Sequence, residues 1–154
     1  MIPISFKLGS FGRASSPAGN KQILSILLEA LTEINEGVYR NNRTLPGLYQ
    51  SGVVYRREPI GQEDWQDIID LYQKGYGDCE DLCCARAAEL RVRAGTQARP
   101  LVKGPKKMPN GVLLYHIVVQ YPDGTIEDPS ERLGMGTRPE PFEHAYTIAE
   151  VLHA

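Results

Sequence analysis

The 154-residue chain has only three cysteines, a single tryptophan and no long apolar run. Two of the cysteines are adjacent, so they do not form the disulfide framework of a small secreted protein, and their use favours a reducing compartment. Residues 1–19 have no basic start and no uninterrupted apolar core, unlike a standard secretion signal. No segment has the length that a membrane span needs. We therefore expect neither standard secretion nor insertion into a membrane.

Neither positive nor negative charge is in large excess. The chain carries 17 basic and 19 acidic residues, a balance that lacks the basic footprint of a nucleic-acid-binding protein. The basic run at residues 103–107, KGPKK, is interpreted as a solvated loop between strands rather than a phosphate site. The composition is otherwise that of an ordinary globular protein, long enough to bury a core. We expect one domain over residues 1–154, with residues 1–19 as a short strand or an N-terminal arm.

Hydrophobic periodicity predicts an α+β fold. Helical spacing of apolar residues predicts helices over residues 20–37, 63–73, 79–94 and 142–153. Runs of β-branched and aromatic residues predict strands over residues 53–55, 97–103, 112–121 and 125–128. The Gly- and Pro-rich segment 130–141 is expected to be a loop. This order of elements favours helices packed on one face of a small antiparallel sheet.

The most informative stretch is GDCEDL, residues 77–82, at the start of an alanine-rich helix. Asp78 can serve as the N-cap, which places Cys79 in the first turn, where free backbone N–H groups and the helix dipole favour an anion. A cysteine is nucleophilic only as the thiolate, so this position suits a reactive thiol. Glu80 and Asp81 would raise rather than lower the pKa of Cys79. We interpret these two carboxylates as helix-stabilising groups that complement the dipole.

His116 lies in the predicted strand 112–121, and Asp128 ends the next strand, so the hairpin register decides whether the two meet. A two-residue turn would place them on opposite faces of the sheet. A three-residue loop at residues 122–124, Pro-Asp-Gly, pairs Tyr121 with Thr125 instead. His116 then becomes the diagonal neighbour of Asp128 on the same face, roughly 7–8 Å away by backbone. Proline suits the first loop position and glycine the left-handed one, which favours this second register.

Other interpretations stay open for several of these residues. Cys79 could be a buried structural thiol, the usual state of a cysteine in a reducing compartment. Cys83 shares a helix face with Cys79, but CxxxCC without a second cluster is not a zinc-binding spacing, so Cys83 and Cys84 are expected to be small buried hydrophobes. His144 and His153 have no acidic or cysteine partner at ligand spacing. We interpret both as ordinary surface or core histidines, so no metal site is expected. No cofactor is expected either, because thiolate chemistry needs none.

The GDCEDL stretch, followed by His116 on a strand and by Asp128 at the end of the next strand, resembles the transglutaminase-like superfamily of papain-type cysteine enzymes. In particular it resembles a small phage-encoded branch, the transglutaminase-like cysteine peptidases. The resemblance covers about residues 55–130, roughly half of the chain. It implies a papain/transglutaminase-like core, in which the catalytic helix packs on a small antiparallel β-sheet with additional helices.

The resemblance also implies a role for each matched residue. Cys79 would be the nucleophile, His116 the base and Asp128 the group that orients the imidazole ring. Gln73 lies six residues before Cys79, a spacing that resembles that of the oxyanion-hole glutamine in papain-like enzymes. The alternative for Gln73 is a solvated glutamine near the end of a helix.

A cysteine, histidine and aspartate in these roles carry out acyl transfer. Water as the acceptor gives a peptidase or amidase, an amine gives a cross-linker, and the sequence leaves both open. The expected substrate is a peptide or protein. The phage-like branch also implies an alternative, a non-catalytic structural or adaptor protein of a phage head, neck or tail that keeps the fold. Its partners would be other phage structural proteins, and its location the host cytoplasm or the virion. The oligomeric state is left open.

Overall fold

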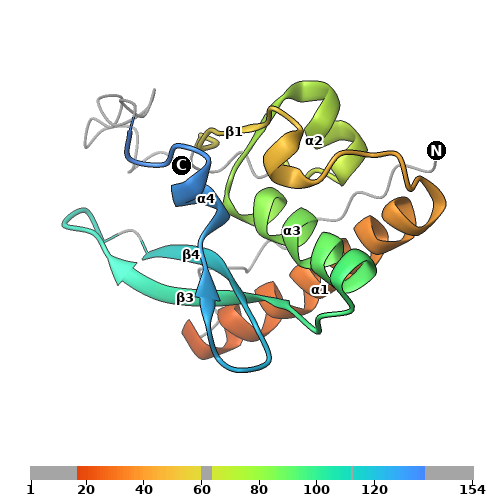
Figure 1. The fold of residues 1–154 in the computed structure, drawn as a ribbon. Coiled ribbons are helices and arrows are strands. Elements are labelled where there is room, and N and C mark those ends of the chain that lie inside the picture. Colours follow the sequence, from red (N-terminus) through yellow and green to blue (C-terminus); the bar gives the residue numbers. More distant parts are fainter. Residues whose placement is uncertain (1–16, 60–63, 112, 138–154) are drawn as a thin grey trace.

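The structure is a computed structural model that describes residues 17–59, 64–111 and 113–137. The fold is mixed α+β, as the sequence predicts (Figure 1). In chain order the elements are α1 (Pro17–Asn41), η1 (Leu48–Gln50), β1 (Val54–Tyr55), α2 (Ile68–Lys74), β2 (Tyr76–Gly77), α3 (Cys79–Ala94), β3 (Arg99–Lys107), β4 (Leu113–Gln120), β5 (Ile126–Glu127) and α4 (Pro129–Arg132). The helix expected over residues 142–153, its two histidines and nearly all of the expected N-terminal arm lie outside the described residues.

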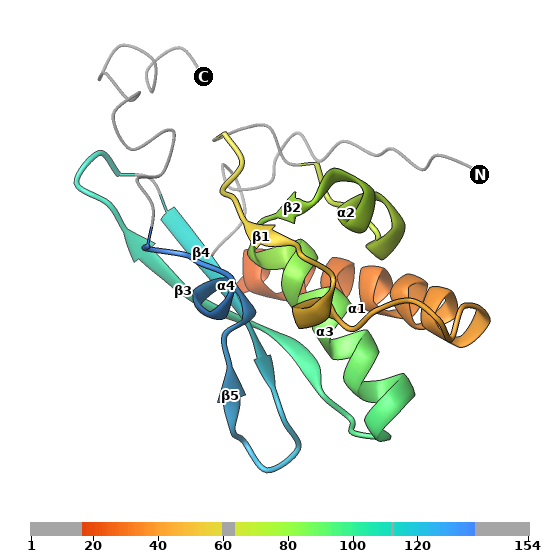
Figure 2. The ribbon, with the colours of Figure 1, turned by 45° about the horizontal axis from the view of Figure 1, so that its top comes forward.

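The helix α3 has the predicted bounds and lies at the centre of the fold. It begins after Asp78, whose backbone is extended, and ends at Gly95, which is left-handed with a φ of 63°. Figure 2 shows the three-stranded sheet and α1 beside α3, with α2 and the β1–β2 pair at its N-terminal end. Because partners cover several sides of α3, its residues from position 81 to 85 and from 87 to 90 are all buried.

Two hydrophobic clusters lie on different sides of α3. The first joins α3 to α1, β3 and β4, and its buried members are Leu24, Leu28, Leu31, Cys83, Cys84, Leu90, Ala98, Val102, Ile117 and Val119. The second joins α3 to the end of α1, to η1 and to α2, through Tyr39, Leu48, Val53, Ile68, Leu71, Leu82, Ala85 and Ala88. The first turn of α3 is therefore held between two cores.

The three-stranded sheet is antiparallel in the order β3-β4-β5, and its hairpin has the predicted register. The backbone N–H of Tyr121 donates to the carbonyl of Thr125 at 2.9 Å. Gly124 in the loop is left-handed, with a φ of 87°. Val119 pairs with Glu127, so the three-residue loop rather than the two-residue turn is confirmed.

Several elements differ in extent from the prediction, some because of tertiary packing and others because of local caps. The helix α1 continues past Gly37 to Asn41, since Tyr39 is 1% exposed and its hydroxyl bonds to that of Tyr72. The short helix α4 forms within the segment expected to be a loop, and Pro129 occupies its first turn. The helix α2 begins only at residue 68, where Asp67 accepts from the backbone N–H groups of residues 69 and 70.

The basic run at residues 103–107 belongs to β3 and is not the loop that we predicted. The ladder with β4 is irregular between Lys103 and Lys106 and then resumes to Lys107. Gly104 permits this irregularity because its φ is +96°. The lysine side chains are exposed on an edge strand of the described sheet, a placement that hinders pairing with other chains.

A second, two-stranded sheet was also not predicted. β1 pairs in parallel with β2, Val54 opposite Tyr76 and Tyr55 opposite Gly77. The other edge of β1 is in contact with the end of α4, since the Tyr55 N–H donates to the Leu133 carbonyl at 3.0 Å. Among the described helices, none has the length and apolar character needed to cross a bilayer.

Candidate active site

The glycine of the GDCEDL stretch is required by close packing rather than by a turn. Gly77 is the last residue of β2, and it is buried. A Cβ at this position would lie 2.6 Å from Leu71 Cδ1 and 2.8 Å from Asp81 Oδ2. Any larger residue would therefore displace the side chains of both Leu71 in α2 and Asp81 at the start of α3.

Asp81 stabilises the start of α3, as predicted, because its carboxylate forms half of a capping box with Asp78. Its burial was not predicted. It is 0% exposed. Its Oδ1 accepts the backbone N–H of Gln66 at 2.8 Å, and its Oδ2 accepts the Nε2–H of the same glutamine at 2.9 Å. Oδ2 also accepts the backbone N–H of Asp78 at 3.4 Å. Burial raises the pKa of Asp81, although the bonds from Gln66 oppose that shift.

Gln66 is thus a residue of the site that sequence reasoning missed. It is 4% exposed, and it ties the segment before α2 to the first turn of α3. Its side-chain Oε1 is buried and has no hydrogen-bond partner in the described part of the chain. The partners are fifteen residues apart, and Gln66 fell within a predicted helix, so no local signal marked the contact.

Cys79 is the first residue of α3, as predicted, and its surroundings favour the thiol over the thiolate. Its side chain is partly buried, and its Sγ–H donates to Glu80 Oε2 at 3.1 Å. Burial raises the pKa of the Cys79 thiol well above its ordinary value, and the negative charge of Glu80 raises it further. These effects outweigh the helix dipole, so the resting thiol is protonated.

His116 and Asp128 meet as the hairpin register predicts. His116 Nε2 lies 2.7 Å from Asp128 Oδ2, and both side chains are partly buried. The other oxygen of Asp128, Oδ1, accepts the backbone N–H groups of Ser130 at 3.0 Å and Glu131 at 3.2 Å. Asp128 is therefore fixed as the N-cap of α4 while it holds the imidazole. The second ring nitrogen, Nδ1, is the atom that could exchange a proton with a thiol.

A thiol one turn beyond Cys79 joins α3 to the strand of His116. Cys83 Sγ–H donates to the Ile117 carbonyl at 3.2 Å. The hydrogen-bonded pairs of the β4–β5 ladder alternate, so the pair after Val119 and Glu127 would be Ile117 with Pro129. Proline has no N–H to donate, and the Cys83 thiol supplies the missing donor.

This contact places the first turns of α3 against the part of β4 that carries His116. Cys79 shares a helix face with Cys83, four residues earlier. No hydrogen bond joins Cys79 to His116 in the described structure, where the polar contact of Cys79 is with Glu80. The structure thus joins His116 and Asp128 directly. It also brings α3, which begins at Cys79, into contact with β4, the strand of His116.

The remaining expectations for this region concern a glutamine and two cysteines. Gln73 is exposed in α2, two residues before the left-handed Gly75 that ends the helix. This is the solvated helix-end glutamine of the alternative interpretation. Cys83 and Cys84 are both 0% exposed, and they are the small buried residues that we predicted. No cluster of three or more His, Cys, Asp or Glu side chains suited to a metal occurs within the described ranges.

A separate recess of about 490 Å³ lies between the C-terminal ends of α1 and α3, at the other end of α3 from Cys79. It is lined by Tyr39, Arg40, Arg43, Arg91, Val92 and Arg93. Three of the four arginines are paired with carboxylates, namely Arg40 with Glu36, Arg91 with Glu29 and Glu36, and Arg93 with Glu89. Basic side chains at helix C-termini complement the dipole, so we interpret these pairs as structural.

Comparisons with known protein families, with curated proteins and with solved structures find no match to this chain. What can be inferred about its function therefore comes from the motif and from the geometry around Cys79, His116 and Asp128.

Proposed function

We propose that the protein is a cysteine-dependent acyl-transfer enzyme with a papain/transglutaminase-like core and a triad of Cys79, His116 and Asp128. Its substrate would be an amide or ester carbonyl of a peptide or protein. The observation that carries the proposal is the 2.7 Å bond between His116 Nε2 and Asp128 Oδ2, on a strand that contacts the helix beginning at Cys79. A carboxylate that holds one ring nitrogen leaves the other free to act as the base.

The proposed reaction has two halves. His116 Nδ1 takes the proton of the Cys79 thiol, and the thiolate attacks the carbonyl carbon to form a tetrahedral intermediate. Free backbone N–H groups in the first turn of α3 would stabilise the oxyanion. The imidazolium then gives its proton to the leaving amine or alcohol, and a thioester remains on Cys79. Water or an amine, deprotonated by His116, attacks the thioester and frees the thiol.

The resting state places a condition on the first half. Because Cys79 Sγ–H is bonded to Glu80 and burial raises the pKa of this thiol, the proton has to leave that contact before it reaches His116. A substrate that turns Glu80 away from the thiol would remove the charge that disfavours the thiolate.

A second candidate is favoured by that same contact. A buried, protonated thiol bonded to a neighbouring carboxylate is the arrangement expected if Cys79 has a structural role. In this alternative the protein is a non-catalytic structural or adaptor component of a phage particle, found in the virion or in the host cytoplasm. Its partners would be other phage structural proteins.

An activated ester tests the proposed activity without knowledge of the natural substrate. The wild-type chain is incubated with p-nitrophenyl acetate, nitrophenolate release is followed, and the acyl adduct is located by mass spectrometry. We expect an acetyl thioester on Cys79 and a turnover that Cys79→Ala and His116→Ala abolish. Turnover that survives either substitution, or acylation confined to other residues, would contradict the triad.

The same experiment can identify the acyl acceptor, and it can also distinguish the enzyme from the structural alternative. Addition of a primary amine such as cadaverine divides the thioester between hydrolysis and amide formation, which distinguishes a hydrolase from a transamidase. A chain with no Cys79-dependent acylation would favour the structural alternative, for which stable association with phage particles is the expected property.

A further inference from the structure

We propose that Arg86 and Glu127 are positioning residues, which hold the His116–Asp128 pair in place against the helix of Cys79. The catalytic meaning of this inference rests on the proposed function, whereas the placement itself can be measured without activity. Glu127 directly precedes Asp128, and it is the last residue of β5. Whatever fixes the side chain of Glu127 therefore also fixes the backbone that presents Asp128 to the imidazole.

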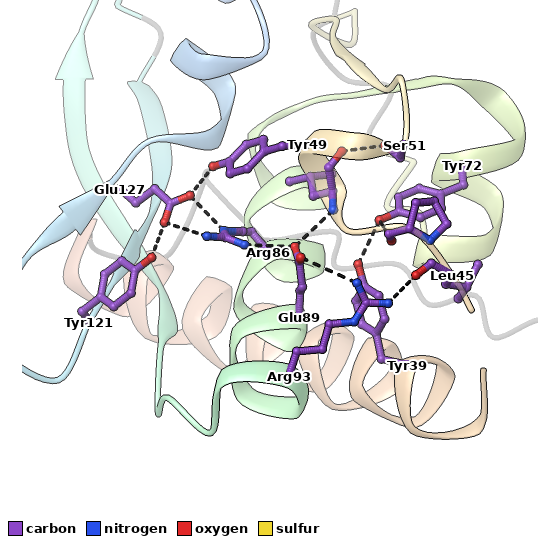
Figure 3. Close-up of polar contacts among 12 residues, drawn as sticks. Tyr39, Leu45, Tyr49, Ser51, Tyr72, Arg86, Glu89, Arg93, Tyr121 and Glu127 are labelled. Atoms are coloured by element: carbon purple, nitrogen blue, oxygen red, sulfur yellow. Dashed lines mark hydrogen bonds and ion pairs between the residues drawn. The ribbon is translucent and has the colours of Figure 1, made fainter. Parts of the chain in front are cut away.

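Four hydrogen bonds converge on Glu127 (Figure 3). Arg86 Nε donates to Oε1 at 2.9 Å, and Arg86 Nη2 donates to Oε2 at 3.5 Å. The hydroxyl of Tyr49 donates to Oε1, and that of Tyr121 donates to Oε2. Burial would raise the pKa of Glu127, but these donors outweigh it and lower the pKa below its usual value. Glu127 is thus an ionised carboxylate with donors on both oxygens.

Arg86 links this carboxylate to two further elements. It belongs to α3, and its Nη1 donates to Glu89 Oε2 at 3.1 Å. Glu89 Oε2 also accepts the backbone N–H of Leu48 in η1 at 3.1 Å. The guanidinium lies over the ring of Tyr49, 4.9 Å from Cζ to the ring centroid. The cluster therefore joins β5 to α3 and to η1 through side chains that are largely buried.

Backbone pairing alone provides little restraint at this point of the sheet. β5 pairs with β4 at only two positions, and the ladder ends there because Pro129 cannot donate. The side-chain cluster thus adds a direct polar connection between the end of β5 and α3. A paired charge with restricted access to water is a strong restraint, since separation would leave each charge in a poorly solvated site.

The test compares Arg86→Met with Arg91→Met. Arg91 lies on the same helix, is buried to a similar degree and is paired with Glu29 and Glu36, but its contacts go to α1 and to the Ala98 carbonyl rather than to β5. Both variants lose a buried ion pair of α3, and only Arg86→Met releases Glu127. The first readout is the proton resonance of His116 Nε2–H, which the bond to Asp128 protects from exchange with water. The second is the turnover of p-nitrophenyl acetate.

We expect Arg86→Met to lose or broaden the His116 resonance and to lower turnover by roughly ten- to a hundredfold, because catalysis is sensitive to displacements of about 1 Å. Arg91→Met should keep both the His116 resonance and the turnover, even if its melting temperature falls by as much as that of Arg86→Met. A sharp, protected resonance in folded Arg86→Met, or equal losses in the two variants, would overturn the inference.

A milder variant keeps the inference testable if Arg86→Met does not fold. Tyr121→Phe removes one donor from Glu127 without any change of charge, and it should shift the same resonance in the same direction by a smaller amount. An unchanged resonance in Tyr121→Phe would then overturn the inference. Failure of the proposed function is distinguishable, because a wild-type chain with a protected His116 resonance and no Cys79-dependent turnover would refute the enzyme and not the positioning.

Discussion

A single carboxylate, that of Asp128, holds the ring of His116 with one oxygen and caps α4 with the other. Oδ2 lies 2.7 Å from His116 Nε2, and Oδ1 accepts the backbone N–H groups of Ser130 and Glu131. The cap sets the direction of the carboxylate, so the imidazole meets an acceptor whose position is already fixed. A substitution that keeps the cap of α4 but weakens the hold on His116 therefore distinguishes a structural from a catalytic role of Asp128.

Asp128→Asn and Asp128→Ala should differ in stability but not in activity. Asparagine caps a helix about as well as aspartate, whereas alanine removes the cap at a cost of about 0.5–2 kcal/mol. We expect urea unfolding to show near wild-type stability for Asp128→Asn and a loss in this range for Asp128→Ala. Turnover of the activated ester should fall by orders of magnitude in both, because neither side chain stabilises an imidazolium. Full turnover in Asp128→Asn would contradict the orienting role.

The state of the Cys79 thiol can be read from its alkylation by iodoacetamide as a function of pH. Burial and the neighbouring carboxylate of Glu80 raise the pKa of Cys79, so the midpoint should lie above the ~8.5 of a free thiol. Glu80→Gln removes a negative charge beside the thiolate and should lower the midpoint, with several-fold faster alkylation at pH 7.5.

Mass spectrometry distinguishes Cys79 from Cys83 and Cys84, which are fully buried and should react last. Glu33→Gln, at an exposed position of α1, is the matched control and should leave the midpoint unchanged. Equal rates for the wild type and Glu80→Gln would show that Glu80 does not control the thiol.

Stability should decrease as the pH rises from about 5 to 8. Burial raises the pKa of both Asp78 and Asp81, so the folded chain binds more protons than the unfolded chain above the ordinary aspartate value of ~3.9. The stabilisation from their protonated forms is complete below that value and is lost as the pH rises through the folded-state pKa values. Each unit of such a shift is worth about 1.4 kcal/mol once both states are ionised.

The lowered pKa values of Glu29 and Glu127 act in the opposite direction, and they limit stability only below about pH 4.5. We therefore expect melting temperatures to be higher near pH 5 than near pH 8. Asp78→Asn keeps a good N-cap and removes one titrating group, so its melting temperature should depend less on pH. Identical pH profiles for the wild type and Asp78→Asn would rule out this assignment.

Substitution by leucine should lower the free energy of unfolding much more at the buried Gln66 than at the exposed Gln73. Gln66→Leu removes the Nε2–H that donates to Asp81 and should cost about 1–3 kcal/mol, since a buried acceptor loses its partner. The deficit should grow from pH 5 to pH 8, because the ionised carboxylate depends more on its donors. Gln73→Leu, at an exposed position of α2, should stay within about 0.5 kcal/mol of the wild type. Urea unfolding of both variants at the two pH values provides the measurement.

The parts of the fold that were predicted correctly have their causes within a few residues. The bounds of α3 follow from Asp78 and Gly95 at its ends, and the hairpin register follows from the three loop residues 122–124. The same register brings His116 to Asp128, so this half of the candidate site could be derived from turn chemistry alone.

The parts that were missed depend on contacts between distant residues. Asp81 was interpreted as a stabiliser of the helix start, but the burial of its carboxylate against Gln66, fifteen residues earlier, was not predicted. The strand at residues 103–107 was assigned to a loop because its lysines and its proline suggest one, yet pairing with β4 extends through it. Neither contact leaves a periodic signal in the sequence.

By itself the sequence determined where α3 begins, which residues face one another across the hairpin, and that the three cysteines form no disulfide framework. These features depend on caps, turn geometry and residue spacing, which act over one or two turns of chain. Only the tertiary structure decided three other features. These are the raised pKa values of Cys79 and Asp81, the ion pair between Arg86 and Glu127, and the burial of Gln66. The physical reason is that the pKa of a side chain depends on its burial and on the charges around it, which are known only once distant segments have packed together.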